Sequence, residues 1–390
     1  MKCFENWLRF NTQKEEKMEF EVYATTNFGA ENVPEKFNKM GGELAGICYM
    51  SGTLQDVINK PESKTLRRAE MVKENRHHSV FDHEYITLYL QDVPKMFAML
   101  LNNEKVYTTS EKSARYTKMD VKGIELDLFV KWKEIFVKLI NDKYGDVPYF
   151  DNKRVEKLAQ ENARYFMSVY TNTSLAYTTS FRQLNYLYTW LKDIDKHPSP
   201  LIRKLKSTAD CFCDFLEKQR LVDHKIADLA DERGFSLIGK KDRVEYFGDV
   251  YSTKYLGSFA ELAQAQRHRT LNYEMKEIDK KSYYIPKIIQ NDDFLKSKWL
   301  EDMIKVEDLT PQGQLVQIYE RGTPENFILK MKERLCTCAQ LEINDQTKAT
   351  LEKYIESTDD LELKATLEKY NKGARCTSGF KCNTPCGFKE

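Results

Sequence analysis

Apolar and polar residues alternate over residues 18–26, a pattern typical of a β-strand with one buried face. Residues 35–51 have helical spacing and end at small residues, and residues 84–93 alternate as a second strand. Residues 94–104 predict a short apolar helix with Pro94 in its first turn, where a missing amide proton costs little. Strands and helices are therefore expected to alternate in this part of the chain.

Longer helical segments are expected after a polar loop at residues 105–120. Before this loop, residues 66–83 predict a helix followed by a loop. After it, most of residues 125–217 have apolar side chains at helical spacing, and the segment 197–200, His-Pro-Ser-Pro, interrupts the pattern.

A strand, a helix, a polar segment and a helix-rich region follow one another again from about residue 232. We interpret this order as a diverged tandem duplication. The predicted fold class is α/β (α+β), with a mixed sheet and long helices. The predicted parts are an N-terminal extension (1–17), a first copy (18–222), a second, shortened copy (232–345), and a charged helical segment with a cysteine-containing tail (346–390).

The chain has 390 residues, 41% of them hydrophobic, enough for two ordinary cores. Its 61 basic and 60 acidic side chains nearly cancel, which argues against bulk binding of nucleic acid or an anionic membrane. Any bound anion is expected to be small and held in a pocket. We find no signal-peptide core and no apolar stretch of about 18 residues, and therefore expect a cytoplasmic protein.

The nine cysteines are an odd number, scattered except near the end, which argues against a disulfide framework. Cys376, Cys382 and Cys386 have spacings that match no common zinc module. We assign no metal site, and the role of these three cysteines stays open.

Three short motifs carry candidate chemistry: HHSVFDH at 77–83, SEKSAR at 110–115, and Arg-His-Arg at 267–269 with Gln264 before it. Forked guanidinium donors suit phosphate oxygens better than an ammonium group does. Arg-His-Arg alone is also typical of a solvated helix end, and Ser-Glu alone of a turn or a helix cap. The motifs become informative when they are taken together and in order.

In that order they resemble the signature of the flavin-dependent thymidylate synthases. That family has an upstream His-x-Ser/Thr-x-Phe-Glu-His element and, after a glutamine, a signature that opens with Arg-His-Arg and ends in Ser-x-Arg. The first copy has the upstream element, with Asp82 for the usual glutamate, and the end of the signature, but residues 103–105 replace Arg-His-Arg. The second copy has Gln264 and Arg-His-Arg, but diverges afterwards.

Two further arginines of the family are divided in the same way. The first copy has Arg164 in an Ala-Arg pair, where the second copy has Glu307. The second copy has Arg334 before an Ala-Gln-x-Glu-Ile run, where the first copy has Leu191. Family members are homotetramers whose active sites lie between subunits. The resemblance therefore implies one composite site per chain, to which each copy contributes the residues that the other has lost.

The resemblance also implies roles for individual residues. The implied catalytic residues are Arg164, Arg334 and His77. The implied substrate-binding residues are Gln264, Arg267, Ser110, Glu111, Lys112, Ser113, Ala114, Arg115, Arg164 and Arg334. The implied cofactor-binding residues are His77, Ser79, Asp82, Arg267, His268, Arg269 and Arg182, and the substitutions Asp82, Ser180 and Tyr186 set this part apart from the family.

The function implied is reductive methylation of dUMP to dTMP through bound FAD, with methylenetetrahydrofolate and NADPH as co-substrates. The expected partners are a small-molecule nucleotide and folate, without nucleic acid or membrane, in a homodimer that resembles a family tetramer. Two alternatives stay open: a one-carbon transfer to another uracil nucleotide, and a non-catalytic nucleotide- or flavin-binding paralogue. Whether the half-sites meet within one chain or across a dimer is also open at this point.

Overall fold

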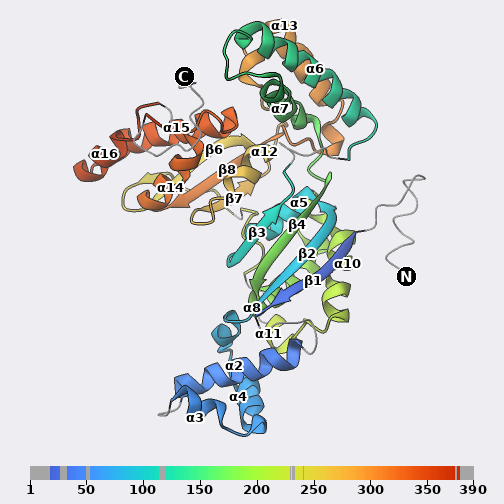
Figure 1. Ribbon diagram of the computed structural model, residues 1–390, viewed down its shortest axis with the longest axis vertical. Coiled ribbons are helices and arrows are strands. Elements are labelled where there is room, and N and C mark those ends of the chain that lie inside the picture. The colour runs from blue at the N-terminus through green and yellow to red at the C-terminus, as the bar shows by residue number, and fades with distance from the viewer. Residues whose placement is uncertain are drawn as a thin grey trace. The chain divides into compact units, whose positions relative to one another are not determined.

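A computed structural model describes residues 18–26, 33–49, 53–113, 120–228, 230, 233–239, 241–373 and 376–377 (Figure 1). These residues form a mixed α/β fold with two antiparallel sheets, which confirms the predicted α/β (α+β) class. The predicted mixed sheet is wrong, because the named strands of both sheets pair in antiparallel orientation. The chain divides into two compact units. Unit 1 comprises Met1–Lys112 and Asn172–Phe235, and unit 2 comprises Ser113–Thr171 and Ser236–Glu390. The predicted extension, 1–17, lies outside the described residues.

Unit 1 contains a four-stranded antiparallel sheet in the spatial order β1-β2-β4-β3. Its strands are β1 (Glu19–Thr25), β2 (Tyr85–Pro94), β3 (Tyr107–Glu111) and β4 (Asn172–Ser180). Its helices are α2 (Val33–Tyr49), α3 (Leu54–Ile58), α4 (Glu62–Glu74), α5 (Lys95–Leu101), α8 (Phe181–Lys192), α9 (Pro200–Arg203), α10 (Lys206–Lys218) and α11 (His224–Ala227), with the 3-10 helices η1 (His78–Asp82) and η3 (Ile194–Lys196).

Two of these strands were not expected from the sequence. β3 lies in the segment predicted as a polar loop, and β4 lies in the stretch predicted to be mostly helical. β4 pairs on one side with β2, where Tyr85 faces Ser180, and on the other with β3, where Tyr107 faces Thr179. Hydrogen bonding on both edges suits a strand rich in threonine and serine, because the two neighbouring strands stabilise its backbone although its side chains are only partly apolar. Pro94 is the N-cap of α5 rather than a residue of its first turn.

The helices α2, α3 and α4 form a group of their own beyond one end of the sheet (Figure 1). Gly42 and Gly46 of α2, four residues apart, form the contact with α4 and its surroundings. A Cβ atom at Gly42 would lie 2.2 Å from the Thr65 carbonyl oxygen, and one at Gly46 would lie 2.6 Å from a methyl carbon of Val57. The two glycines therefore permit a close helix approach that larger residues would prevent.

Unit 2 contains a second antiparallel sheet, in the order β5-β6-β8-β7. Its strands are β5 (Tyr246–Phe247), β6 (Tyr251–Ser258), β7 (Asn272–Lys276) and β8 (Leu315–Gly322). Its helices are α6 (Ile124–Tyr144), α7 (Asn152–Ala163), α12 (Phe259–Ala265), α13 (Asp293–Ile304), α14 (Pro324–Arg334), α15 (Leu341–Ser357) and α16 (Leu361–Glu368), with the 3-10 helices η2 (Arg164–Phe166), η4 (Lys287–Ile289) and η5 (Glu307–Leu309).

An aromatic core joins α6, α7 and α13 in unit 2. Trp132 and Trp299 are fully buried and meet edge to face with ring centroids 4.9 Å apart, and Phe136 and Phe166 pack around them. The indole nitrogen of Trp132 donates to the buried carboxylate of Asp302 at 2.9 Å. This core fixes the C-terminal end of α7, from which the first candidate site residue projects.

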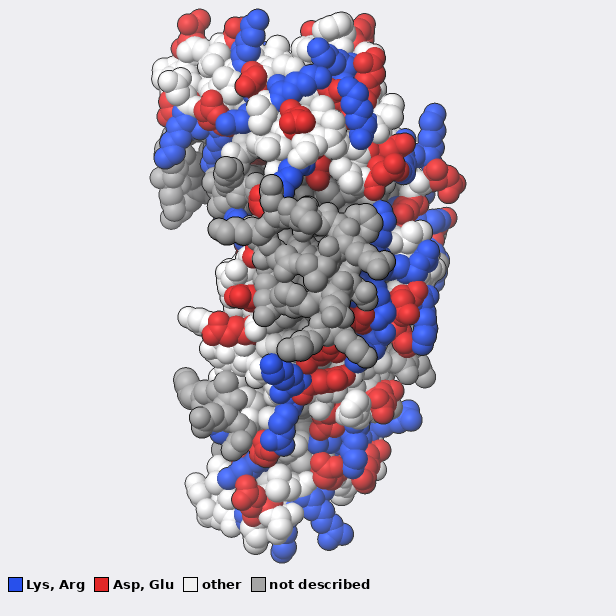
Figure 2. All heavy atoms as spheres, turned by 90° about the vertical axis from the view of Figure 1, so that its right-hand side faces the viewer, with Lys and Arg blue, Asp and Glu red and all other residues white. Residues whose placement is uncertain are grey.

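The two sheets have the same strand order when each is numbered from its own first strand. In both, the second strand runs directly into a helix, and the fourth strand is followed by a helix whose N-cap is a hydroxyl residue, Ser180 or Thr323. This is the arrangement that a tandem duplication would produce, and the duplication itself stays a prediction. None of the helices within the described ranges is long and apolar enough to cross a bilayer. On the face drawn in Figure 2, Lys and Arg side chains lie interspersed with Asp and Glu.

Candidate active site

Arg164 lies where helix α7 ends and η2 begins. Asp151 caps the start of this helix by accepting a hydrogen bond from the Arg154 amide at 2.9 Å. The buried face of α7 packs on α6. Arg164 is only 6% exposed, and its Nη2 donates to Oε1 of Gln340. The guanidinium is thus held in a fixed place in the interior of unit 2.

Gln264 lies in the last turn of α12. This helix follows β6 without a loop, because Ser258 ends the strand and its hydroxyl accepts from the Glu261 amide at 3.0 Å. The Gln264 side chain donates through Nε2 to the same Gln340 oxygen that Arg164 contacts. Its own Oε1 is buried and has no hydrogen-bond partner among the described residues. A buried amide oxygen without a donor is costly, so this atom is suited to accept from an N–H group of a ligand.

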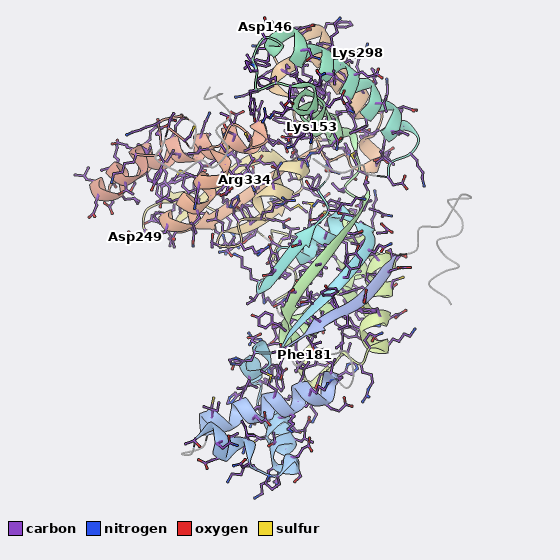
Figure 3. The ribbon with its side chains drawn as sticks, viewed as in Figure 1. Asp146, Lys153, Phe181, Asp249, Lys298 and Arg334 are labelled. Atoms are coloured by element: carbon purple, nitrogen blue, oxygen red, sulfur yellow. The ribbon has the colours of Figure 1, made fainter. Side chains whose placement is uncertain are left out.

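Arg334, labelled in Figure 3, is the last residue of α14 and contacts two residues of the Arg-His-Arg region. Its Nε donates to His268 Nε2 at 2.7 Å, and its Nη2 donates to the Gln264 backbone oxygen at 3.2 Å. A guanidinium can only donate, so His268 accepts at Nε2 and carries its proton on Nδ1. Burial, together with the positive charge of Arg334, lowers the pKa of His268 to about 2. The imidazole is therefore neutral at physiological pH.

The three residues of the Arg-His-Arg motif have different surroundings. His268 turns inward to Arg334, whereas Arg267 and Arg269 are exposed. The backbone amides of Arg267 and His268 continue the helical hydrogen bonding by donating to Gln264 and Ala265. Two of the three side chains are therefore at the surface, and the predicted role of all three against a flavin stays a prediction.

In unit 1 the HHSVFDH segment, residues 77–83, contains the 3-10 helix η1 and the residue on either side of it. His77 and Ser79 are exposed, while His78 between them is buried and its Nε2 lies 3.0 Å from the Lys73 carbonyl oxygen. Asp82 binds Arg182 through both carboxylate oxygens and accepts from the Ser180 hydroxyl at 2.8 Å. Asp82, Ser180 and Arg182, all noted from the sequence, therefore form one cluster.

The segment that carries the end of the signature is only partly described. Ser110 and Glu111 belong to β3, and the Lys112 amide continues the ladder by donating to Ser174 at 2.9 Å. The carboxylate of Glu111 accepts from Lys95 at 2.6 Å. Ser113 is the last described residue of this segment, and Ala114 and Arg115 lie outside the described residues. Their predicted contacts with substrate stay predictions.

The residues that occupy the equivalent positions in the other predicted copy can be identified by aligning the strands of the two sheets. When β4 and β8 are aligned at their first residues, Arg164 aligns with Glu307, and Arg334 aligns with Leu191. When β2 and β6 are aligned where each enters its helix, His268 aligns with Glu104.

Glu104 is fully buried in unit 1 and pairs with Arg233 at 3.3 Å. Two of these aligned positions therefore carry a carboxylate: Glu307 aligns with Arg164, and Glu104 aligns with His268. A carboxylate repels a phosphate, so these positions of the other half-site are unsuited to binding an anion.

The structure brings together one predicted residue of the first copy, Arg164, with three of the second copy, Gln264, His268 and Arg334, all within unit 2. Sequence reasoning missed Gln340, which joins them. A signal was present, because Gln340 is the glutamine of the Ala-Gln-x-Glu-Ile run that follows Arg334.

A model of the family described as thymidylate synthase complementing protein (Thy1) matches residues 38–205. This match confirms, over the matched segment, the resemblance seen in the sequence. The match lies in the first predicted copy and ends before the second. No match was found among curated proteins.

Three solved structures are similar to this chain. A thymidylate synthase X (ThyX) from Helicobacter pylori with FAD and dUMP has 18% identity and a TM-score of 0.32, over 54% of this chain and 99% of that chain. A flavin-dependent thymidylate synthase ThyX from Helicobacter pylori complexed with FAD and dUMP has 16% identity and a TM-score of 0.31, over 53% and 98%. A UMP/dUMP methylase PolB from Streptomyces cacaoi bound with 5-Br dUMP has 14% identity and a TM-score of 0.32, over 56% and 96%.

Proposed function

We propose that this chain is a flavin-dependent enzyme of the thymidylate synthase type. It methylates dUMP reductively to dTMP, with methylenetetrahydrofolate as the carbon donor, NADPH as the reductant and FAD as the cofactor. The observation that supports this proposal is the meeting of Arg164, from the first copy, with Gln264 and Arg334, from the second, inside unit 2. Such a meeting provides one composite site in each chain.

In this proposal Gln264, Arg164 and Arg334 hold the pyrimidine. Gln264 Oε1 accepts the N–H that a uracil ring presents between its two carbonyl groups, which gives this buried oxygen the donor it lacks. The guanidinium groups of Arg164 and Arg334 stabilise the negative charge that builds on the uracil oxygens when the ring is activated for bond formation from C5 to the one-carbon unit. Because His268 is neutral, Arg334 keeps its full positive charge for the substrate.

Bound FAD would supply the reducing equivalents for the methyl transfer. The chain has residues that fit such a group. In unit 1, the exposed His77 and Ser79 offer polar contacts for the edge of a flavin ring, and Asp82 at the end of the same 3-10 helix pairs with Arg182 of α8. In unit 2, the exposed Arg267 suits the oxygens of a phosphate.

The function is tested by incubating the purified protein with dUMP, FAD, NADPH and methylenetetrahydrofolate and identifying the product by mass spectrometry. The expected product is dTMP, with release of tritium from C5-labelled dUMP and a flavin absorption band in the protein. Replacing dUMP with UMP tests the alternative one-carbon transfer. A protein that binds flavin but converts neither nucleotide would instead be a non-catalytic paralogue.

Matched variants test the composite site. Arg164→Gln is expected to lower kcat/KM for dUMP by about 10²-fold or more, because a charge that stabilises the transition state is lost. Its control is Glu307→Gln, at the aligned position, which is expected to keep activity within about threefold. Arg267→Ala and Arg115→Ala are each expected to abolish activity, with Asn103→Ala as the control for Arg267. Full activity in Arg164→Gln, Arg267→Ala or Arg115→Ala would rule out the composite site.

A further inference from the structure

Gln340 contacts residues of both predicted copies in unit 2. Its Oε1 accepts from Arg164 of the first copy and from Gln264 of the second, and its Nε2 donates to the Tyr165 hydroxyl. All four side chains are almost fully buried, with exposed fractions of 6% or less. The carboxamide oxygen has two lone pairs, and both are used by these donors.

The hydrogen bonds of this group run in one direction only. Arg164 cannot accept, which fixes the Gln340 oxygen towards it and the nitrogen towards Tyr165. Burial, together with the nearby Glu342 carboxylate, raises the pKa of Tyr165 well above its usual range, so the phenol keeps its proton. Tyr165 donates that proton to Glu342 at 2.7 Å. Reversing the Gln340 amide would face its NH2 group to Arg164 and its oxygen to a phenol that already donates elsewhere.

The last hydrogen bonds of this series are made at the start of α12. Glu342 accepts from the Ser258 amide at 2.8 Å and from the Ser258 hydroxyl at 2.7 Å. Ser258 is the N-cap of α12, the helix that carries Gln264. The network therefore begins at Gln264, passes through Gln340, Tyr165 and Glu342, and returns to the base of the same helix. A closed path of this kind restricts both the rotation of the Gln264 side chain and the placement of its helix.

Gln340 also occupies a position at which its side chain could cap the helix that follows it. It is the N-cap of α15, yet its side chain makes no capping hydrogen bond. A side-chain cap typically contributes about 1 kcal/mol to helix stability. The side chain is instead used entirely in contacts with residues of other elements, which indicates that its role is tertiary.

We propose that Gln340 is a positioning residue that holds Arg164 and Gln264 in register with each other, through the fixed amide orientation set by Tyr165 and Glu342. The kinetic part of this inference rests on the proposed function, because it assigns to Gln340 the alignment of two residues of that site. Gln340 itself need not touch the substrate. Its loss is expected to release Arg164 and Gln264 from their common acceptor.

The first experiment measures coupling without using activity. Unfolding constants are compared for Arg164→Met, Gln264→Leu and the double variant, in the wild-type background and in a Gln340→Leu background. With Gln340 present, the two substitutions are expected to be non-additive by at least about threefold in the unfolding constant, and with Gln340→Leu they are expected to become additive. Additive effects in the wild-type background, or unchanged coupling in the Gln340→Leu background, would overturn the proposal.

The second experiment separates positioning from general stability. Gln340→Leu is expected to lower kcat for dUMP by about 10²-fold. Gln340→Glu, which keeps the acceptors for Arg164 and Gln264, should recover at least tenfold of that loss. Gln312→Leu removes another buried carboxamide of unit 2, which donates to Ser168 at 3.2 Å, and is the control expected to leave kcat unchanged.

The outcomes of the two experiments distinguish the two claims. An active wild type whose Gln340→Leu variant has unchanged kcat would overturn the positioning role. An inactive wild type with intact coupling between Arg164 and Gln264 would overturn the proposed function. It would still support the role of Gln340 in holding these two residues together.

Discussion

Arg164 and Gln264 donate hydrogen bonds to one and the same atom, Oε1 of Gln340. The two donors come from different predicted copies of the sequence, and both lie in unit 2 of a single chain. This part of the predicted composite site therefore does not need a second subunit to bring its members together. The sequence had left open whether they meet within a chain or across a dimer.

The Arg334–His268 contact gives a prediction about protonation. In Arg334→Met, the aliphatic stem is largely kept and the positive charge is lost, so the pKa of His268 is expected to rise from about 2 towards its usual value. Proton NMR titration of the six histidines between pH 4 and 8 would then detect one more titrating residue than in the wild type. A matched Lys332→Met variant, an exposed residue of the same helix, should not change the titration. An unchanged His268 signal in Arg334→Met would show that burial alone keeps this imidazole neutral.

Glu84 predicts a pH dependence of stability in the opposite direction from that of an ion-paired acid. Burial raises the pKa of this fully buried carboxyl to about 9, from an ordinary value of 4.5. Between these two values the folded state keeps a proton that the unfolded state releases, so stability falls as the pH rises through this window. Each pH unit costs up to about 1.4 kcal/mol.

The variant Glu84→Gln is expected to remove this dependence, and to be more stable than the wild type at pH 8. Urea unfolding at pH 5 to 9 measures the effect, with Glu19→Gln, an exposed acid of the same unit, as the control. Parallel curves for the wild type and Glu84→Gln would contradict the prediction.

A buried ion pair in unit 2 gives a stability prediction. Lys330 and Glu320 are both fully buried and lie 2.6 Å apart, and Glu320 also accepts from Tyr251 and Tyr255. Lys330→Met leaves a buried carboxylate without its cation and is expected to lower the free energy of unfolding by about 3–5 kcal/mol. Adding Glu320→Gln should restore much of that loss. The surface pair of Lys196 and Asp193 is the control, and Lys196→Met should cost at most about 1 kcal/mol. A small effect of Lys330→Met would show that water reaches Glu320.

The close approach of α2 to α4 predicts a reversal of the usual helix preference. Alanine in place of glycine inside a helix is ordinarily stabilising by about 1 kcal/mol. At Gly42 the added methyl group would lie 2.2 Å from a backbone oxygen, which cannot move as a flexible side chain can. We therefore expect Gly42→Ala to destabilise the protein by about 1–3 kcal/mol in thermal or urea unfolding. Glu43→Ala on the same helix is the control, and a stabilised Gly42→Ala would show that the helices can separate without cost.

The sequence by itself determined the fold class and most of the helices. The strand β6 and the helix α12 were readable because alternation and helical spacing are local properties of the chain. The resemblance, confirmed over residues 38–205, also came from short local motifs. Arg164, Gln264 and Arg334 were selected from such motifs before their positions in space were known.

Only the tertiary structure decided the rest. The strand β4 was missed because its threonine-rich pattern becomes a strand through pairing with β2 and β3, which lie elsewhere in the chain. The neutral state of His268 depends on burial and on Arg334, neither of which a tripeptide reveals. Gln340 gained its role because three segments meet at one buried amide, and the cost of leaving any of those polar atoms unpaired fixes their geometry.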